Sequence, residues 1–383
     1  MPPDHAAPPL DVDRILADPG VRTVVCCGAG GVGKTTTAAA LALRAAERHG
    51  RRTVVLTIDP ARRLAQSLGL TELDNTPRQV KGIDAVGSGG ELHAMMLDMK
   101  RTFDEVVLTH TDAQKAADIF ANPFYQAMSS TFAGTQEYMA MEKLGQLHAG
   151  GEWDLIVVDT PPSRSALDFL DAPARLSRFL DGRMLRLLLA PARAGGRSMF
   201  SLVTASFGMF SRAVQKVLGA QLLSDLSGFV AALDSTFGGF RQRAEQTYRI
   251  LQADETAFLL VAAPEPDAVR EAAYFAGRLG EERMPLAGLV LNRVHRPVAP
   301  QLSAEHALAA AGRLDADGGH GATAEALRVH AAVAQQAARE RQVAQLFTEA
   351  FPQVPVAAVR AQPADVHDVD GLRTIGQAMS QVD

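Results

Sequence analysis

The fold is decided by one stretch of sequence, VRTVVCCGAGGVGKTT, at residues 21–36. Its first part, 21–27, is an apolar run typical of a buried strand. Residues 28–35 fit the pattern G-x-x-x-x-G-K-[ST], and an Ala-rich stretch from Lys34 to about His49 predicts a helix. A strand, a glycine-rich turn and a helix in this order form a phosphate-binding unit of α/β proteins.

The chemistry of this loop predicts a nucleotide site. Its glycines allow successive backbone N–H groups to face phosphate oxygens without interference from a Cβ atom. Lys34 is expected to reach the β- and γ-phosphates, where it takes part in catalysis, and Thr35 to bind Mg²⁺ through its hydroxyl. Thr36 is placed to bond the α-phosphate. We therefore expect a purine nucleoside triphosphate, ATP, bound with Mg²⁺ by Gly28, Gly30, Gly31, Val32, Gly33, Lys34, Thr35 and Thr36.

Further apolar runs predict a sheet around this unit. Residues 53–58 form one run that ends at Asp59, and residues 155–158 form another that ends at Asp159. Other short runs lie at 92–97, 258–262, 286–291 and 354–359, and Pro355 restricts the last of them to a sheet edge. Short continuous apolar strands that alternate with helices indicate burial on both faces. We therefore expect an α/β fold with a doubly wound, mostly parallel sheet.

The remaining segments suggest how the chain is organised. Residues 1–20, rich in Pro and Asp, predict a loose lead-in, and residues 21–383 the nucleotide-binding domain. Two stretches with little strand signal, at about 100–150 and 163–254, predict an inserted helical subdomain. Residues 301–325 contain Asp-Gly-Gly-His-Gly-Ala-Thr and predict a surface connection.

Polar residues follow several of the predicted strands, where an α/β sheet places its ligand. Asp159 is expected to hold Mg²⁺ directly or through water, and Asp59 to orient the water that attacks the γ-phosphate. Asn292 is placed to read the adenine edge with its amide. For each of the three, a turn or helix cap is the structural alternative. Arg62 and Arg63 either contact phosphate or lie on a solvated helix face.

Composition excludes several classes of protein. A net charge of −5 and a pI near 6.1 give no electrostatic basis for nucleic-acid binding. The cysteines are Cys26 and Cys27, which as neighbours in a strand point to opposite faces, so neither a disulfide nor a CxxC zinc site is predicted. His93, His148 and His295 lack metal-ligand spacing, which favours solvent or core roles.

The sequence also predicts a cytoplasmic protein. Its N-terminus lacks the basic stretch and apolar run of a secretory signal. The longest uncharged apolar segment, between Arg197 and Arg212, falls short of the roughly 18 residues that a membrane-spanning helix requires. Any membrane contact is therefore expected to be peripheral.

At these residues the sequence resembles the ArsA-type branch of the deviant P-loop ATPases. This branch includes arsenical-pump ATPases and the ATPases that target tail-anchored membrane proteins. Residues 28–36 match the family's phosphate loop except at its second position. Residues 58–64 resemble its switch I, with Asp59 on the water-orienting aspartate, and residues 158–163 resemble its switch II. Asn292 falls on the adenine-contacting asparagine.

The resemblance covers nearly the whole chain, and the segments 135–144 and 167–173 most resemble actinobacterial ArsA-like proteins. It implies a dimeric switch that hydrolyses ATP and whose helical insertion carries cargo. In this chain the Met-, Phe- and Leu-rich segment 183–215 is a candidate contact for a hydrophobic client or a membrane surface; a plain helical core is the alternative.

Three departures from the family pattern limit this expectation. The arsenite-binding cysteines and the zinc-binding CxxC have no counterpart. The signature lysine that reaches across the dimer to the partner's nucleotide is replaced by Ala29. The chain is thus expected to form a homodimer that switches slowly, or to pair with an ArsA-like subunit that keeps the lysine. A nucleotide-binding regulatory subunit with little turnover of its own is the second functional class.

Overall fold

The computed structural model describes residues 7–59, 63–85, 87–123, 125–126, 135–161, 242–318 and 320–381. The predicted features that fall wholly or partly outside these residues are the start of the lead-in at 1–6, residues 60–62 of switch I with Arg62, residues 127–134 of the first helical insertion, the end of switch II at 162–163, the motif at 167–173, the segment 183–215 and most of the second helical insertion. The described chain divides into two compact units. The first holds residues 7–96, 147–161 and 250–381, and the second holds the described residues of 97–146 together with 242–249.

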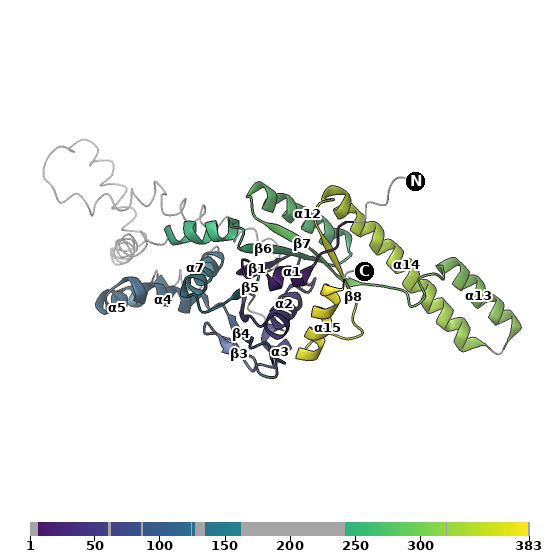
Figure 1. Cartoon of the computed structure of the whole chain (residues 1–383), viewed down its shortest axis with the longest axis horizontal. Coiled ribbons are helices and arrows are strands. Elements are labelled where there is room, and N and C mark those ends of the chain that lie inside the picture. The colour runs from purple at the N-terminus through teal and green to yellow at the C-terminus, as the bar shows by residue number, and fades with distance from the viewer. Residues whose placement is uncertain are drawn as a thin grey trace, which may run out of the picture. The chain divides into compact units, whose positions relative to one another are not determined.

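The first unit is built on an eight-stranded sheet (Figure 1). Its strands are β1 (Thr23–Cys27), β2 (Arg52–Thr57), β3 (Arg78–Gln79), β4 (Glu91–Met96), β5 (Leu155–Asp159), β6 (Thr256–Ala262), β7 (Leu286–Val294) and β8 (Val356–Arg360). They lie in the order β3-β4-β2-β5-β1-β6-β7-β8. All pairs are parallel except β3 with β4, so the predicted α/β fold with a mostly parallel sheet is confirmed.

The burial of the strands explains which of them the sequence predicted. Every residue of β1, β5 and β6 is buried, as expected for central strands that are covered on both faces. Strand β8 begins directly after Pro355 and lies at the sheet edge, which confirms the restriction that this proline imposes. The two-residue strand β3 was missed because it is too short to show a hydrophobic period.

Helices cover both faces of the sheet (Figure 1). The chain passes from β1 through α2 (Lys34–His49) to β2, whereas β6, α12 (Pro266–Glu281) and β7 advance across the sheet in the opposite direction. Because such crossovers are almost always right-handed, opposite directions place α2 and α12 on opposite faces. A short helix, α3 (Arg63–Ser67), contacts α2.

The N-terminal segment differs from the loose lead-in that the sequence predicts. Residues 12–17 form the helix α1 (Val12–Ala17), whose side chains Val12 and Leu16 are buried in the hydrophobic cluster beneath α2. Asp13 binds Arg44 of α2 through two hydrogen bonds of 2.7 and 2.6 Å. Leu10 N also donates to Val356 O at 3.1 Å, so this segment packs as part of the first unit.

The predicted surface connection at 301–325 is wrong. These residues belong to two long helices, α13 (Ala304–Asp317) and α14 (Gly321–Ala350), which pack against each other. Ser303 caps α13 by accepting a hydrogen bond from His306 N at 3.2 Å. Within the glycine-rich stretch that suggested a loop, Gly318, whose φ is 68°, ends α13, and His320 precedes α14.

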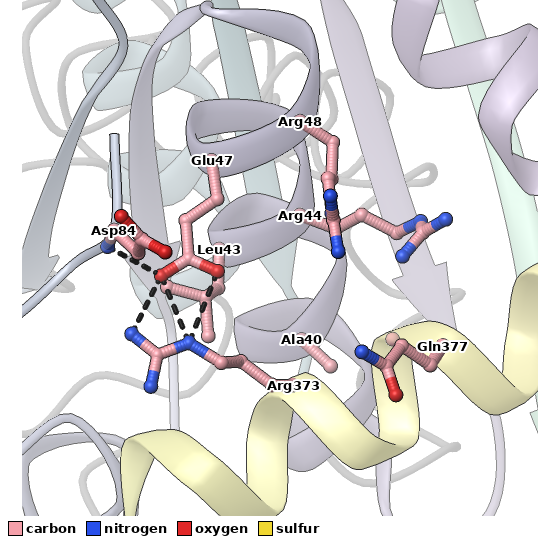
Figure 2. A pocket seen from close by; sticks show the side chains of 9 residues that line it. Ala40, Leu43, Arg44, Glu47, Arg48, Asp84, Arg373 and Gln377 are labelled. Atoms are coloured by element: carbon pink, nitrogen blue, oxygen red, sulfur yellow. Dashed lines mark hydrogen bonds and ion pairs between the residues drawn. The ribbon is translucent and has the colours of Figure 1, made fainter. Parts of the chain in front are cut away.

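The C-terminal helix α15 (Val369–Ser380) packs on α2, on the same face of the sheet (Figure 2). Arg373 donates to both carboxylate oxygens of Glu47 on α2 at 2.7–3.1 Å, and the backbone N of Asp84 donates to the same carboxylate at 2.7 Å. A surface pocket of about 120 Å³ lies beside this ion pair. The network joins the end of the chain to the helix that follows the phosphate loop.

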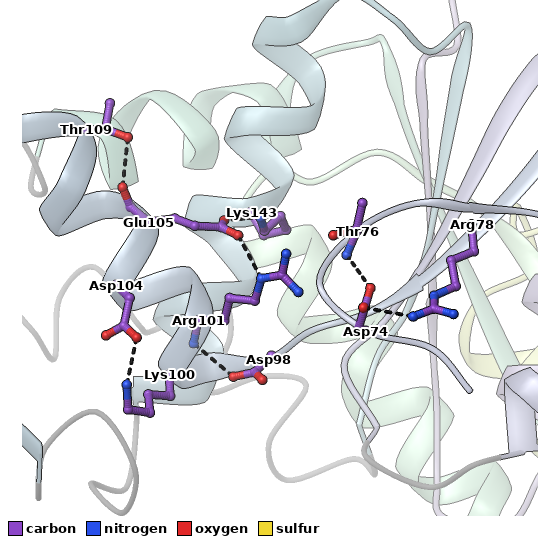
Figure 3. A network of polar contacts seen from close by, with 10 residues as sticks. All are labelled: Asp74, Thr76, Arg78, Asp98, Lys100, Arg101, Asp104, Glu105, Thr109 and Lys143. Carbon is purple, nitrogen blue, oxygen red and sulfur yellow. Dashed lines mark hydrogen bonds and ion pairs between the residues drawn. The ribbon is translucent and has the colours of Figure 1, made fainter. Parts of the chain in front are cut away.

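The second unit is helical in its described part. It contains α4 (Met99–His110), α5 (Ala113–Ala121) and most of α7 (Thr135–Gly150). Lys143 on α7, itself buried, binds Glu105 on α4 at 2.6 Å, and Figure 3 shows this pair among the charges along α4. Among the described helices of the whole chain, none combines the length and apolar character required to cross a bilayer.

We predict that α1 contributes to stability as a core element. Leu16 is 1% exposed, so Leu16→Ala should lower the free energy of unfolding by about 2–5 kcal/mol, as expected for a buried leucine. Leu308→Ala provides the matched control, because Leu308 is 45% exposed and its loss should cost about 0.5 kcal/mol or less. Urea unfolding measures both; equal losses would show that α1 is not part of the core.

Candidate nucleotide-binding site

The phosphate loop, residues 28–35, joins β1 to α2 with a backbone that only glycine adopts readily. Gly28 has φ 153° and Gly33 has φ 96°. A Cβ atom on Gly28 would lie 2.0 Å from Val261 O, and one on Gly33 would lie 2.3 Å from Asn292 Nδ2. The loop therefore fits closely against β6 and β7, and glycine is required at both positions for steric reasons as well.

Lys34 begins α2 and has a side chain that is nearly enclosed. Its Nζ donates to Gly28 O at 2.9 Å and to Ala29 O at 2.8 Å. Burial lowers the pKa of Lys34, and the carboxylate of Asp159 acts in the opposite direction. The ammonium group thus lies within the loop, close to where phosphate oxygens are expected to bind.

Asp159 is the carboxylate at the centre of the site. It ends β5 between β1 and β2, opposite Cys26 on one side and Thr57 on the other. Its Oδ2 accepts hydrogen bonds of 2.8 Å from the hydroxyls of Thr35 and Thr57. Its Oδ1 is fully buried and has no hydrogen-bond partner among the residues that the structure describes.

These groups suit a magnesium ion. A buried carboxylate oxygen without a partner is costly unless a cation or donor binds it. Hard oxygen ligands are those that Mg²⁺ prefers, and this ion is commonly held by one or two protein oxygens, by phosphates and by water. Asp159 and Thr35, the two predicted metal ligands, are in direct contact and fit this requirement. Thr57, for which the sequence suggested no role, supports the same carboxylate.

Asp59 follows β2 and lies beside this centre. Its backbone N donates to Thr57 Oγ1 at 3.2 Å, and Ile58 N donates to Asp159 O at 3.0 Å. The negative charge of Asp59 contributes to raising the pKa of both Asp159 and Lys34. The predicted water-orienting carboxylate is therefore in electrostatic range of the predicted metal ligand and the loop lysine.

Asn292 connects the phosphate loop to β7. Its Nδ2 donates to Val32 O at 2.8 Å, and its Oδ1 accepts from Arg293 N at 2.9 Å. Arg293 has φ 62°, a left-handed conformation that is uncommon outside glycine, and the register of β7 with β8 shifts at this point. The amide predicted to read adenine thus tethers the loop and lies on the wall of a cavity.

This cavity has a volume of about 1190 Å³ and follows the carboxyl edge of the sheet. Residues of the phosphate loop form its middle, Asp59 and Arg63 lie at the β2 end, and Asn292 at the β7 end. Arg63, an exposed residue of α3, lines this cavity, which is compatible with both alternatives left open by the sequence. The lining residues that sequence reasoning did not assign to the site are Gln66, Ser67, Arg293, His295, residues 360–367 and Ile375.

A family model described as "Anion-transporting ATPase" matches residues 21–301. The chain belongs to this family. The resemblance to ArsA-type ATPases that the motifs indicated is thereby confirmed. The match contains the phosphate loop, Asp59, Asp159 and Asn292, and it ends before α13.

Individual relatives match shorter segments. A protein named ATPase GET3 from Malassezia globosa is 30% identical over 179 residues, which are 46% of this chain and 50% of that protein. A putative arsenical pump-driving ATPase from Chlorobaculum tepidum is 30% identical over 164 residues, 41% of this chain and 37% of that protein. An uncharacterized protein from Streptomyces coelicolor, an actinobacterium, is 33% identical over 181 residues, 47% of this chain and 43% of that protein. The chain thus spans half or less of the length of these relatives.

Ala29 is the residue at which this family member departs from the signature. It is buried, and it belongs to the hydrophobic cluster that also contains α2. Its carbonyl oxygen accepts a hydrogen bond from Lys34. The loop is therefore complete around Lys34 without a second charged side chain at this position.

We predict that binding of Mg²⁺ with nucleotide weakens at acidic pH. Burial raises the pKa of Asp159 from 3.8 to about 6, so its carboxylate is mostly charged above that pH and mostly protonated below it. Because a proton and the metal compete for the same oxygens, affinity should fall by up to about tenfold per pH unit below it. Titration of Mg²⁺–ADP between about pH 5 and 8 measures this dependence.

Two controls define the result. Asp159→Asn should bind Mg²⁺–ADP weakly and without this pH dependence, and wild type with ADP and a chelator should not show the step near pH 6. A flat wild-type profile would contradict the assignment of Asp159 as the metal ligand.

Proposed function

We propose that this chain binds ATP with Mg²⁺ in the cavity at the sheet edge and hydrolyses it to ADP and phosphate. The observation that carries the proposal is the buried carboxylate of Asp159: its Oδ2 accepts a hydrogen bond from Thr35 of the phosphate loop, and its Oδ1 has no partner among the described residues. Family membership supports the reaction, since the family is described as an ATPase family.

We infer the orientation of the nucleotide in the cavity from the order of the strands. Asp159 and Asp59 follow β5 and β2, on one side of β1, whereas Asn292 follows β7 on the other side. Asp159 and Thr35 would hold Mg²⁺, which would neutralise charge on the terminal phosphates, so we place the γ-phosphate toward Asp159. The nucleoside then lies toward the β7 end, where Asn292 is the candidate contact for adenine.

Each residue has a distinct chemical role in this arrangement. Backbone N–H groups of the loop and Lys34 bind the phosphate oxygens, and Thr36 lies on the cavity wall in reach of the α-phosphate. Thr35 and Asp159 would hold Mg²⁺, which when bound neutralises charge on the β- and γ-phosphates. Asp59 orients the attacking water and accepts its proton.

The proposal extends to a dimer and to a client, both suggested by the relatives. Two chains would bring their nucleotide sites together, and the segment 183–215 would contact a hydrophobic or membrane-associated partner of this otherwise cytoplasmic protein. That segment lies outside the described residues. Support for this part of the proposal therefore comes from sequence and family alone.

Ala29 favours a second candidate function. Without a lysine at this position, a pair of identical chains lacks the charge that would reach across to the partner's nucleotide. Cations supplied in trans contribute strongly to phosphoryl transfer in related enzymes. The chain could therefore act as a regulatory subunit that binds nucleotide with little turnover, paired with an ArsA-like subunit that has the lysine.

Two substitutions separate binding from hydrolysis. Lys34→Ala should reduce ATP affinity by more than about tenfold, because it removes a phosphate contact. Asp59→Asn should retain affinity and reduce turnover by roughly 10²–10⁴-fold, the usual contribution of a general base. ATP titration and phosphate release measure the two effects. Lys81→Ala and Asp84→Asn, both at exposed positions, are the matched controls. If wild type binds ATP tightly but does not hydrolyse it, the result favours the regulatory subunit.

Mixing experiments test the missing lysine. Purified chain is combined with a lysine-bearing member of the family, and turnover of the mixture is compared with the sum of the separate rates. A rate well above that sum, lost when the partner's lysine is replaced by alanine, supports a mixed dimer. Full turnover by this chain alone as a homodimer would contradict it.

A further inference from the structure

The helices α13 and α14 form an arm that lies beyond the segment matched by the family model. The match ends at residue 301, and α13 begins at Ala304. The first part of α14 packs on α13, where Arg328 pairs with Asp315. Farther along, α14 packs on α12 and β7, so this one helix connects α13 to the sheet.

Glu340 lies in the middle of α14 and is 3% exposed. Its carboxylate accepts three hydrogen bonds. Oε2 accepts from the backbone N of His295 at 2.7 Å, and Oε1 bonds His295 Nδ1 at 2.6 Å and Gln336 Nε2 at 2.9 Å. A buried carboxylate is stable only when its oxygens are satisfied in this way, and two of the three contacts come from a single residue, His295.

His295 belongs to the wall of the nucleotide cavity. It comes directly after β7, the strand that carries Asn292, which bonds the phosphate loop. The His295 side chain is 44% exposed. Because Nδ1 is bound to Glu340, Nε2 is the ring nitrogen left for a ligand, and among the described residues it has no hydrogen-bond partner.

The position of His295 along the cavity indicates which part of a bound nucleotide would lie next to it. The phosphate loop lies in the middle of the cavity, Asp59 lines its β2 side, and Asp159 ends β5, next to β2. His295 lies on the β7 side with Asn292. A histidine there faces the ribose and base, which can bond to Nε2 or stack on the ring.

We propose that Glu340 is a positioning residue for the nucleoside end of this site: it orients His295 so that the imidazole contacts the ribose or base. The inference rests on the proposed nucleotide binding. It adds a residue from the arm, outside the family-matched segment, to the determinants of nucleoside affinity. Glu340 does not touch the ligand and acts through His295.

The experiment compares two ligands that share the phosphate contacts. ADP and inorganic tripolyphosphate, each with Mg²⁺, are titrated into wild type, Glu340→Gln, His295→Ala and the double variant. Glu340→Gln and His295→Ala should each weaken ADP binding about tenfold, as expected for one charge-assisted contact, and leave tripolyphosphate affinity unchanged. The double variant should bind ADP no more weakly than His295→Ala, because Glu340 acts through the ring. Glu349→Gln, at an exposed position of the same helix, is the control.

The outcomes separate this inference from the proposed function. If wild type binds neither ligand, the nucleotide site itself is wrong. If wild type binds both and the single variants bind ADP as wild type does, or lose both ligands equally, Glu340 has no positioning role. Thermal unfolding checks each variant; should Glu340→Gln fail to fold, His295→Ala decides the question, because the exposed ring can be removed while Glu340 keeps its other two donors.

Discussion

The carboxylate of Asp159, buried at the carboxyl edge of the sheet, is the constraint on which the rest of the site depends. It ends a strand that lies between β1 and β2, and its hydrogen bonds to Thr35 and Thr57 join the phosphate loop to the neighbouring strand. A buried charge must be compensated, so Lys34, the two hydroxyls and the strand register are mutually fixed. The oxygen left without a partner then becomes the feature around which a metal and a triphosphate can be arranged.

Local patterns explain how much of this could be predicted. The glycines, Lys34 and Thr35 of the loop stand next to each other in sequence, and apolar runs mark the central strands. Parallel strands bring their carboxyl ends to one edge, so Asp59, Asp159 and Asn292 could be grouped from their positions alone. The error at 301–325 has the same origin, since clustered glycines predict a loop, whereas Gly318 ends α13 and Gly321 begins α14.

The site residues that the sequence did not predict are brought to the site by contacts between segments that are distant in sequence. His295 carries no local signal, and its side chain is held by Glu340 on α14, which lies 45 residues farther along the chain. The segment 360–367 reaches the cavity because β8 pairs with β7. A short edge strand preceded by a proline does not predict that the residues after it line a cavity. Thr57 has an apolar strand around it, so only the register with Asp159 shows its function.

The charged residues that one chain places at the γ-phosphate end affect the rate of the proposed ATP hydrolysis. At the γ-phosphate end, Asp59 and Asp159 both carry negative charge, and Lys34 with Mg²⁺ must offset them together with the triphosphate. Arg63, which lines the cavity beyond Asp59, is the further cation that the described residues place at this end. Since Ala29 supplies none to a partner, charge that develops in the proposed reaction would be stabilised by Lys34, Mg²⁺ and Arg63, or by a cation from a different subunit. A chain with this balance suits slow turnover that a partner accelerates.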